Sequence, residues 1–367
     1  MTLFEGLDPE GLYAGRIEGP EGPLVVRWTG GVLSDVTCRA VPTMRDLLER
    51  EDVADWLRAA RGREVAEPEV LLAPCDLQAV KACGVTFARS MIERVIEERA
   101  GGDSAAAEAV RARIADAVGQ RLRDLVPGSE KAAQAKAALQ AEGLWSQYLE
   151  VGIGPDAEVF TKCPPMAAVG SGAEVGIHPA SDWNNPEPEI VLAVDSRGVP
   201  RGATLGNDVN LRDVEGRSAL LLGKAKDNNA SAAIGPMVRL FDEGFGMEDV
   251  RRAEIVLRVE GADGFVLTGR SSMSEISRDP EDLVAQAIGP HHQYPDGLML
   301  YLGTLFSPVE DRDAPGQGFT HKPGDRVEIA AEGLGRLVNT VGPATECPPW
   351  TLGAGGLMRN LAGRGLL

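Results

Sequence analysis

The chain of 367 residues lacks several features that define common classes of protein. It has only five cysteines, which are scattered and form no Cys-x-x-Cys pair, and this argues against a disulfide framework or a cysteine zinc site. It has no apolar run of membrane-spanning length, and its first residues lack the basic and apolar regions of a signal peptide. We therefore expect a cytoplasmic protein with reduced thiols and no membrane partner.

Basic residues are also few relative to acidic ones. The 37 Lys and Arg residues stand against 55 Asp and Glu residues, which gives a formal net charge of −18. Proteins that bind nucleic acid draw much of their affinity from Lys and Arg, so this balance argues against a nucleic-acid partner. A small anionic substrate remains compatible, provided that a metal ion or a few lysines reverse the charge locally.

Several catalytic motifs are absent as well. The sequence contains no Gly-x-Ser-x-Gly nucleophile elbow, no Walker loop and no dinucleotide-binding fingerprint. Adjacent residues of an extended chain point to opposite sides, so His291 and His292 are not expected to share a metal ion. His178 and His321 flank turns, and we expect both of them at the surface.

The length favours two domains, or one domain with an extension. Residues 12–41 alternate short apolar runs with Gly and Pro, which predicts a small antiparallel sheet. Residues 43–60 have the apolar spacing of a helix or a helix pair. We therefore predict a small N-terminal α/β domain over residues 1–68 and a catalytic domain over residues 69–367.

The composition of the second part predicts an α+β protein. Strong helix formers dominate after residue 88 and predict a helical insertion over about residues 89–147, with Ser129 as the N-cap of its last helix. A further helix should begin at Pro280, with Asp279 as N-cap. The expected strands cover residues 79–85, 158–162, 253–259, 265–268, 299–304, 326–330 and 335–341. We expect them to form a large mixed sheet that curls on itself.

The stretch 184–213 stands out because acidic residues lie in two predicted strands that are joined by a turn at 196–198. Side chains alternate along a strand, so Glu187 and Glu189 point to one face. Folding the hairpin about its turn brings Asp208 opposite Glu187. Carboxylates in this arrangement suit a hard cation, Mg²⁺ before Ca²⁺ or Mn²⁺, and the alternative is a solvated edge hairpin with unrelated acids.

Lysines lie close in sequence to this hairpin. On the strand before it, Glu158, Phe160 and Lys162 share one face. The lysine-rich segment that contains Lys226 follows the hairpin, and we expect a loop there that closes at residues 235–236. Ammonium groups beside a metal would hold the carboxylate of a substrate, whereas a single lysine is more often a solvated surface charge.

Three segments together resemble the fumarylacetoacetate hydrolase family. They read Pro-Glu-Pro-Glu-Ile-Val-Leu-Ala-Val at 186–194, Gly-Asn-Asp-Val-Asn-Leu-Arg-Asp at 206–213, and Lys-Ala-Lys-Asp at 224–227 with Ile-Gly-Pro shortly after. The similarity covers about residues 70–367 and implies a mixed β-roll core. Members are typically homodimers or dimers of dimers, so we expect a homodimer or a homotetramer.

The resemblance also implies roles for single residues. The family's Mg²⁺ ligands (Ca²⁺ or Mn²⁺ in some members) fall on Glu187, Glu189 and Asp208. The lysines that contact substrate fall on Lys162 and Lys226, and we assign Lys226 to catalysis. A structural arginine falls on Arg212 and a substrate-contacting threonine on Thr304, and we expect both at the substrate site.

One segment departs from the family's hydrolases and decarboxylases. These carry Gly-x-Asn-Tyr-x-x-His-x-x-Glu, whose His and Glu handle the attacking water or proton. Residues 84–93 keep the glutamate as Glu93, but Ser90 stands at the histidine position. Serine is a poor base at neutral pH, so we do not expect Ser90 to activate water. We expect Ser90 and Phe87 to contact the substrate instead.

The segments 90–100, 143–151 and 360–367 are similar to those of the family's 2-keto-3-deoxy-pentonate dehydratases. The resemblance implies Mg²⁺-dependent dehydration of 2-keto-3-deoxy-D-pentonate, a small sugar acid derived from D-xylonate or D-arabinonate, to 2,5-dioxopentanoate in non-phosphorylating pentose catabolism. Glu158 is then the expected base and Glu93 the second choice. Two alternatives stay open: a C–C hydrolase of 2,4-diketo-3-deoxy sugar acids or acylpyruvates, and a family member that binds sugar acids without catalysis.

Overall fold

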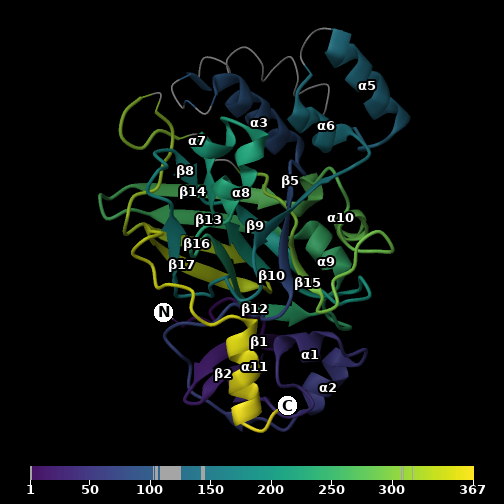
Figure 1. Cartoon of the computed structure of the whole chain (residues 1–367), viewed down its shortest axis with the longest axis vertical. Helices are drawn as coiled ribbons and strands as arrows, with labels where there is room; N and C mark the ends of the chain where they lie inside the picture. Colours follow the sequence, from purple (N-terminus) through teal and green to yellow (C-terminus); the bar gives the residue numbers. More distant parts are fainter. Residues whose placement is uncertain are drawn as a thin grey trace.

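The structure is a computed structural model of the whole chain. It describes residues 2–101, 103, 106–107, 125–141, 145–306, 308, 310–315 and 317–367, except for the side chains of residues 88–90, 92 and 97. Two large sheets run through the molecule, and a group of helices lies at each of its two ends (Figure 1). No helix within these ranges is long and apolar enough to cross a membrane.

Among the described residues, the larger sheet has ten strands. Its neighbours pair antiparallel except for β15 (Leu298–Tyr301) and β5 (Ala79–Gly84), which are parallel. In spatial order its strands are β4 (Arg63–Glu64), β3 (Val32–Asp35), β2 (Gly22–Thr29), β1 (Tyr13–Gly19), β12 (Ala232–Leu240), β10 (Pro200–Asp208), β9 (Pro188–Val194), β15, β5 and β6 (Glu158–Cys163).

The second sheet has five strands within the part of the chain that the structure describes, and it packs on one face of the first. Its order is β14 (Val266–Ser272), β13 (Glu254–Glu260), β16 (Arg326–Ala331), β17 (Gly335–Pro343) and β7 (Glu174–Ile177). Two short strands, β8 (Asn184–Asn185) and β11 (Asn210–Leu211), pair beside the ends of β9 and β10. Large sheets of mixed strand direction combined with helices confirm the α+β class, and the closed β-roll and the domain limits stay predictions.

Helices at the two ends of the molecule cover different parts of these sheets. At one end lie α3 (Ala88–Ala100), α5 (Glu130–Ala141) and α6 (Gln147–Ile153), and at the opposite end lie α1 (Met44–Leu48), α2 (Val53–Ala59) and α11 (Ala354–Gly363) (Figure 1). The others are α7 (Arg212–Glu215), α8 (Leu222–Lys226), α9 (Met247–Arg252), α10 (Pro280–Ala287) and the 3₁₀ turns η1 (Ala219–Leu221) and η2 (Met273–Glu275).

Two helix starts predicted from the sequence are confirmed. The carboxylate of Asp279 accepts the backbone N–H of Glu281 at the start of α10, with Pro280 at the first helical position. Ser129 accepts the N–H of Ala132 at the start of α5, with a distance of 3.2 Å from Oγ to N. In both cases a side chain satisfies an N–H group that has no partner inside the helix.

Strand β9 is buried on both faces and divides two apolar cores. Ile190, Leu192 and Val194 belong to the core between the two sheets, whereas Val191 and Ala193 belong to the core that α1 and α2 cover. The uninterrupted apolar run of this strand is typical of a strand without a solvent-facing side. The hairpin of β9 and β10 is therefore central in its sheet, and the edge-hairpin alternative is wrong.

Two local predictions are also wrong. Residues 235–236 were expected to close a loop, but they lie inside β12, a fully buried strand in the larger sheet. Proline seldom occurs in a central strand because it lacks the N–H group, and here the pairing of β10 with β12 shifts register nearby, between Ala203 and Leu205. His321 was expected at the surface, but it is buried, and its Nδ1 lies 3.2 Å from Asp325 Oδ2.

Candidate active site

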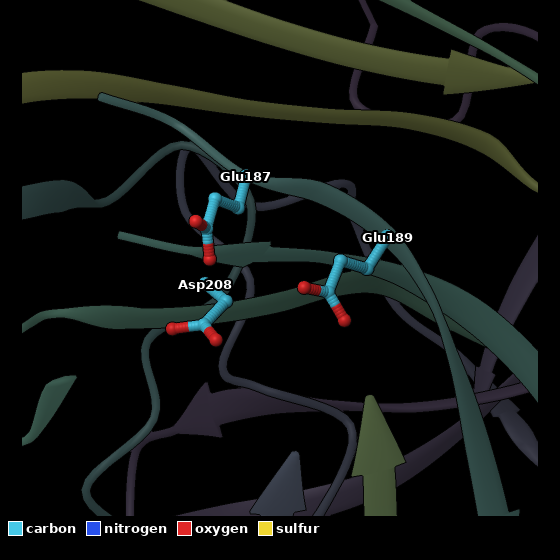
Figure 2. A group of neighbouring side chains, drawn as sticks. All are labelled: Glu187, Glu189 and Asp208. Carbon is cyan, nitrogen blue, oxygen red and sulfur yellow. The ribbon is translucent and has the colours of Figure 1, made fainter. Parts of the chain in front are cut away.

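The hairpin brings three acidic side chains together. The backbone N–H of Asp208 donates to the carbonyl of Glu187 at 3.0 Å, and Gly206 pairs with Glu189, so the predicted juxtaposition is confirmed. One carboxylate oxygen from each acid lies within 4.8 Å of the others. Figure 2 shows the three carboxylates turned toward one another at the ends of the two strands. All three side chains are buried.

An amide side chain positions the backbone of Glu187, and a backbone N–H group positions the carboxylate of Glu189. Asn207 Oδ1 accepts the N–H of Glu187 at 3.1 Å. The N–H of Gly303 donates to Glu189 Oε2 at 2.6 Å, and Gly303 has φ +94°, a conformation that favours glycine. A Cβ on Gly303 would lie 1.9 Å from Thr86 Oγ1. Glycine is therefore needed here both for its backbone conformation and for space.

Two buried lysines neutralise part of this negative charge. Lys162 Nζ lies 2.7 Å from Asp208 Oδ1 and donates to the carbonyl of Val209 at 3.0 Å. Lys226 Nζ donates to Asp208 Oδ2 at 3.1 Å and to Glu187 Oε2. Buried carboxylates are tolerated only when such partners compensate for lost hydration. Both lysines thus belong to the site and not to the solvated surface.

Burial and the neighbouring charges shift the pKa values of these groups in different directions. Burial raises the pKa of Glu189 well above its usual range, and the neighbouring Asp208 and Glu187 raise it further. Burial disfavours the charged form of Asp208, but the two lysines outweigh burial and lower its pKa. Burial also disfavours the charged form of Lys226, but Asp208 and Glu187 outweigh it and raise the Lys226 pKa. Lys226 is therefore a persistent positive charge.

Arg94 on α3 is a member of the site that sequence reasoning missed. Its guanidinium lies 2.6 Å from Glu187 Oε1 and 2.7 Å from Glu215 Oε2. Arg94 also lines the cavity beside the three acids. The sequence offered no signal for it, because arginine is an ordinary surface residue in a segment rich in Ala, Glu and Arg.

Glu158 faces the three acids from another strand. It lines the cavity together with Phe160, which agrees with the strand face predicted for both, and it pairs with Gly84 across β5 and β6. Burial raises the pKa of Glu158 to about 7, and the negative charge of Glu215 contributes to the rise. Its carboxylate forms no hydrogen bond or ion pair with any residue in the described ranges. Glu158 can therefore exchange a proton near neutral pH.

The donor set fits a hard divalent cation. Glu187, Glu189 and Asp208 are, within the part of the chain that the structure describes, the one group of three His, Cys, Asp or Glu residues arranged to hold an ion. All three supply carboxylate oxygens, which suit Mg²⁺, Mn²⁺ or Ca²⁺ and disfavour softer metals. The chemistry of this donor set supports the metal prediction.

The remaining predicted site residues differ in whether they line the cavity beside the three acids. Thr304 lines the cavity, and its hydroxyl accepts the N–H of Phe306 at 3.1 Å. Phe87 is fully buried in the core between the sheets and is not among the residues that line the cavity. The side chain of Ser90 lies outside the described residues. The roles assigned to these residues stay predictions.

Glu93 and Arg212 contact each other next to the site. Arg212 Nη2 lies 3.7 Å from Glu93 Oε2, and the guanidinium stacks on Trp183 at 4.2 Å from the ring centroid. Arg212 also donates to the carbonyl of Pro308 at 3.0 Å. It thereby links α3, the residue before β8 and the loop after β15. Neither Glu93 nor Arg212 is among the residues that line the cavity.

The fold and the buried acids define a protein able to hold a divalent cation at the end of a β-hairpin. Residues 147–342 match the family described as fumarylacetoacetate (FAA) hydrolase, C-terminal, and this range contains the hairpin and the lysines. The chain belongs to the fumarylacetoacetate hydrolase family.

Two curated relatives share part of the chain. A protein of Haloferax volcanii named probable 2-keto-3-deoxyxylonate dehydratase is 31% identical over 194 residues, which cover 53% of this chain and 63% of the relative. The 2-dehydro-3-deoxy-D-arabinonate dehydratase of Saccharolobus solfataricus is 29% identical over 184 residues, which cover 50% of this chain and 58% of the relative. The chain thus spans about three fifths of the length of each relative.

A solved structure shares the fold over most of the chain. It is a 2-keto-3-deoxy-D-arabinonate dehydratase complexed with magnesium and 2,5-dioxopentanoate, with a TM-score of 0.63. The match covers 90% of this chain and 98% of that one at 20% sequence identity. At this identity the likeness shows a common fold, and the reaction has to be argued from the site.

Proposed function

We propose that this protein is a Mg²⁺-dependent hydro-lyase that converts a 2-keto-3-deoxy-D-pentonate to 2,5-dioxopentanoate and water, in non-phosphorylating pentose catabolism. The observation that carries the proposal is Glu158, a carboxylate of near-neutral pKa that faces the three clustered acids without a partner of its own among the described residues. The names of the two curated relatives and of the solved structure support the same substrate class.

Glu187, Glu189 and Asp208 would hold the ion, which, when bound, polarises the 2-keto group of the substrate and makes its C3 hydrogens more acidic. The charged side chains Lys162, Lys226 and Arg94 reduce the negative potential that would otherwise repel an anionic sugar acid. Binding of an acid in an acidic cavity therefore depends on these cations as well as on the ion.

Glu158 acts as the base and then as the acid. As a carboxylate it accepts a proton from C3, and the C3–C4 double bond forms as the C4 hydroxyl departs. Protonated Glu158 donates to that hydroxyl, which leaves as water. A proton then shifts from C5 back toward C3, and the resulting enol becomes the C5 aldehyde. One molecule of substrate thus gives one molecule of 2,5-dioxopentanoate and one of water.

The ammonium group of Lys226 does not act as a proton donor in this proposal. Its ammonium group is bound to Asp208 and Glu187, whose charges raise its pKa, so it releases a proton poorly. We therefore assign to Lys226 the orientation of these two carboxylates and the attraction of the substrate. Glu93 is less favoured than Glu158 as the base, because Glu93 lies beside Arg212 and does not line the cavity.

Product analysis tests the proposal. The Mg²⁺-loaded protein is incubated with 2-keto-3-deoxy-D-xylonate or, separately, with a 2,4-diketo acid, and the products are identified by NMR. We expect 2,5-dioxopentanoate from the first and no cleavage of the second. Pyruvate from the diketo acid without 2,5-dioxopentanoate would support the C–C hydrolase instead. Binding of both acids without turnover would support a protein that only binds them.

A further inference from the structure

Both carboxylate oxygens of Glu187 already have cationic partners. Arg94 Nη2 lies 2.6 Å from Oε1, and Lys226 Nζ donates to Oε2. A divalent cation that binds Glu187 must therefore share or replace one of these two partners. The positive charges of Arg94 and Lys226 thus contact the same oxygens that a divalent cation would use.

The two partners differ in how firmly they are held. Lys226 is 2% exposed, contacts Asp208 as well as Glu187, and its carbonyl accepts a hydrogen bond from Ser231 Oγ at 2.8 Å. Lys226 is thus fixed by its surroundings at both main chain and side chain. A cation that binds Glu187 would therefore replace Arg94 more easily than Lys226.

Arg94 has an alternative partner on its other side. Its Nη1 lies 2.7 Å from Glu215 Oε2, and its side chain is 13% exposed, more than the 3% of Lys226. Glu215 lies on α7 and is not one of the three clustered acids. The guanidinium can therefore leave Glu187 and keep a buried carboxylate as counter-ion, which avoids the cost of an unpaired buried charge.

The charges around the cavity favour such an exchange. Five carboxylates gather there, and three cationic side chains accompany them: Glu158, Glu187, Glu189, Asp208 and Glu215, with Lys162, Lys226 and Arg94. A bound divalent cation adds two positive charges beside the three cationic side chains that are already there. The repulsion between that cation and the guanidinium of Arg94 falls when the guanidinium leaves Glu187 and keeps its contact with Glu215.

We propose that Arg94 is an internal counter-ion of the metal centre, which competes with the divalent cation for Glu187 and, when the cation binds, leaves Glu187 while it keeps its contact with Glu215. The inference rests on the metal site of the proposed function. It makes Arg94 a residue that sets cation affinity. Removing its charge should therefore strengthen cation binding, which is the opposite of what is expected for a residue that only orients a metal ligand.

The test is isothermal titration calorimetry with Mg²⁺ on the full chain after treatment with a chelator. The variants are Arg94→Gln, Arg94→Lys and, as a control for loss of one positive charge, Arg63→Gln on the exposed strand β4. We expect Arg94→Gln to bind Mg²⁺ roughly tenfold more tightly than the wild type. Arg94→Lys keeps the positive charge but lacks the two guanidinium nitrogens that contact Glu187 and Glu215 together, so its gain in Mg²⁺ affinity should be smaller. Arg63→Gln should show no gain in Mg²⁺ affinity.

The outcomes separate this inference from the proposed function. A wild type that binds Mg²⁺, with Arg94→Gln binding equally or more weakly, would overturn the counter-ion role and leave the metal site intact. A wild type that binds no Mg²⁺ would overturn both. If Arg94→Gln does not fold, as judged by circular dichroism, Arg94→Lys decides: tighter binding than the wild type supports the role, and equal or weaker binding refutes it.

Discussion

The carboxylate of Glu158 lies against the backbone of Gly84, its partner on the neighbouring strand. A Cβ on Gly84 would come within 2.0 Å of Glu158 Oε2, so no other residue leaves the carboxylate in this position. The two residues are 74 positions apart in sequence and meet only because β5 pairs with β6. The placement of the proposed base thus depends on a residue that has no side chain.

This contact predicts the effect of Gly84→Ala. The added methyl group should displace the Glu158 carboxylate by an ångström or more and lower kcat by ~10²-fold. The three acids on β9 and β10 are not affected, so Mg²⁺ affinity should stay within about twofold of the wild type. Steady-state kinetics and calorimetry measure the two quantities. Unchanged kcat would mean that Glu158 is not the base.

The raised pKa of Glu158 predicts how stability depends on pH in the metal-free protein. Its pKa rises from 4.5 to about 7 on folding, so the native state binds the proton more tightly than the unfolded state. Stability from this group is fully present below the unfolded pKa and is lost as pH rises through about 7. Glu158→Gln removes this loss because the amide is always neutral.

The free energy of unfolding in urea, with a chelator present, measures this effect. The advantage of Glu158→Gln over the wild type should grow by about 1–2 kcal/mol between about pH 5.5 and about pH 8. An advantage that is constant with pH would show that the carboxyl group titrates at its ordinary pKa in the folded protein.

Replacing Lys162 should lower the stability of the folded protein by a large amount. Lys162→Met leaves Asp208 with one cationic partner fewer in a fully buried place, and we expect the free energy of unfolding to fall by about 3–5 kcal/mol. Lys81→Met is the control, because Lys81 lies on the adjacent strand β5 and, among the described residues, its ammonium group donates only to Thr161, at 2.9 Å. Its loss should cost about 1 kcal/mol or less. Equal urea midpoints for the two variants would contradict this account.

Gly303→Ala should disturb the position of Glu189. Alanine at φ +94° costs about 1–2 kcal/mol in backbone strain, and its Cβ would collide with Thr86 Oγ1. The N–H group that donates to Glu189 would shift with it. We expect lower thermal stability together with weaker Mg²⁺ binding. A destabilised variant with unchanged Mg²⁺ affinity would show that this hydrogen bond does not position Glu189.

The sequence predicted those parts of the site that follow from local periodicity. Strand alternation placed Glu187 and Glu189 on one face, and a short turn placed Asp208 opposite them. The helix cap at Asp279 was likewise predicted from neighbouring residues. These relationships need only the geometry of one element or one hairpin, and the structure has them as predicted.

Other parts depend on contacts between distant segments. Arg94 reaches Glu187 only because α3 packs over the end of the larger sheet. Strand β12 was missed because Pro236 argues against a central strand, yet β12 joins the N-terminal strands to the rest of that sheet. His321 is buried beside Asp325, which local turn chemistry did not indicate. Such features depend on tertiary packing, which overrides local preference.

The rate of 2,5-dioxopentanoate formation in Glu158→Gln tests the central claim most directly. With saturating Mg²⁺ and 2-keto-3-deoxy-D-xylonate, we predict that the wild type forms the product and that a chelator stops it. We predict that Glu158→Gln binds Mg²⁺ as well as the wild type does but forms the product at least ~10²-fold more slowly. Turnover by Glu158→Gln at the wild-type rate would contradict the assignment of Glu158 as the base.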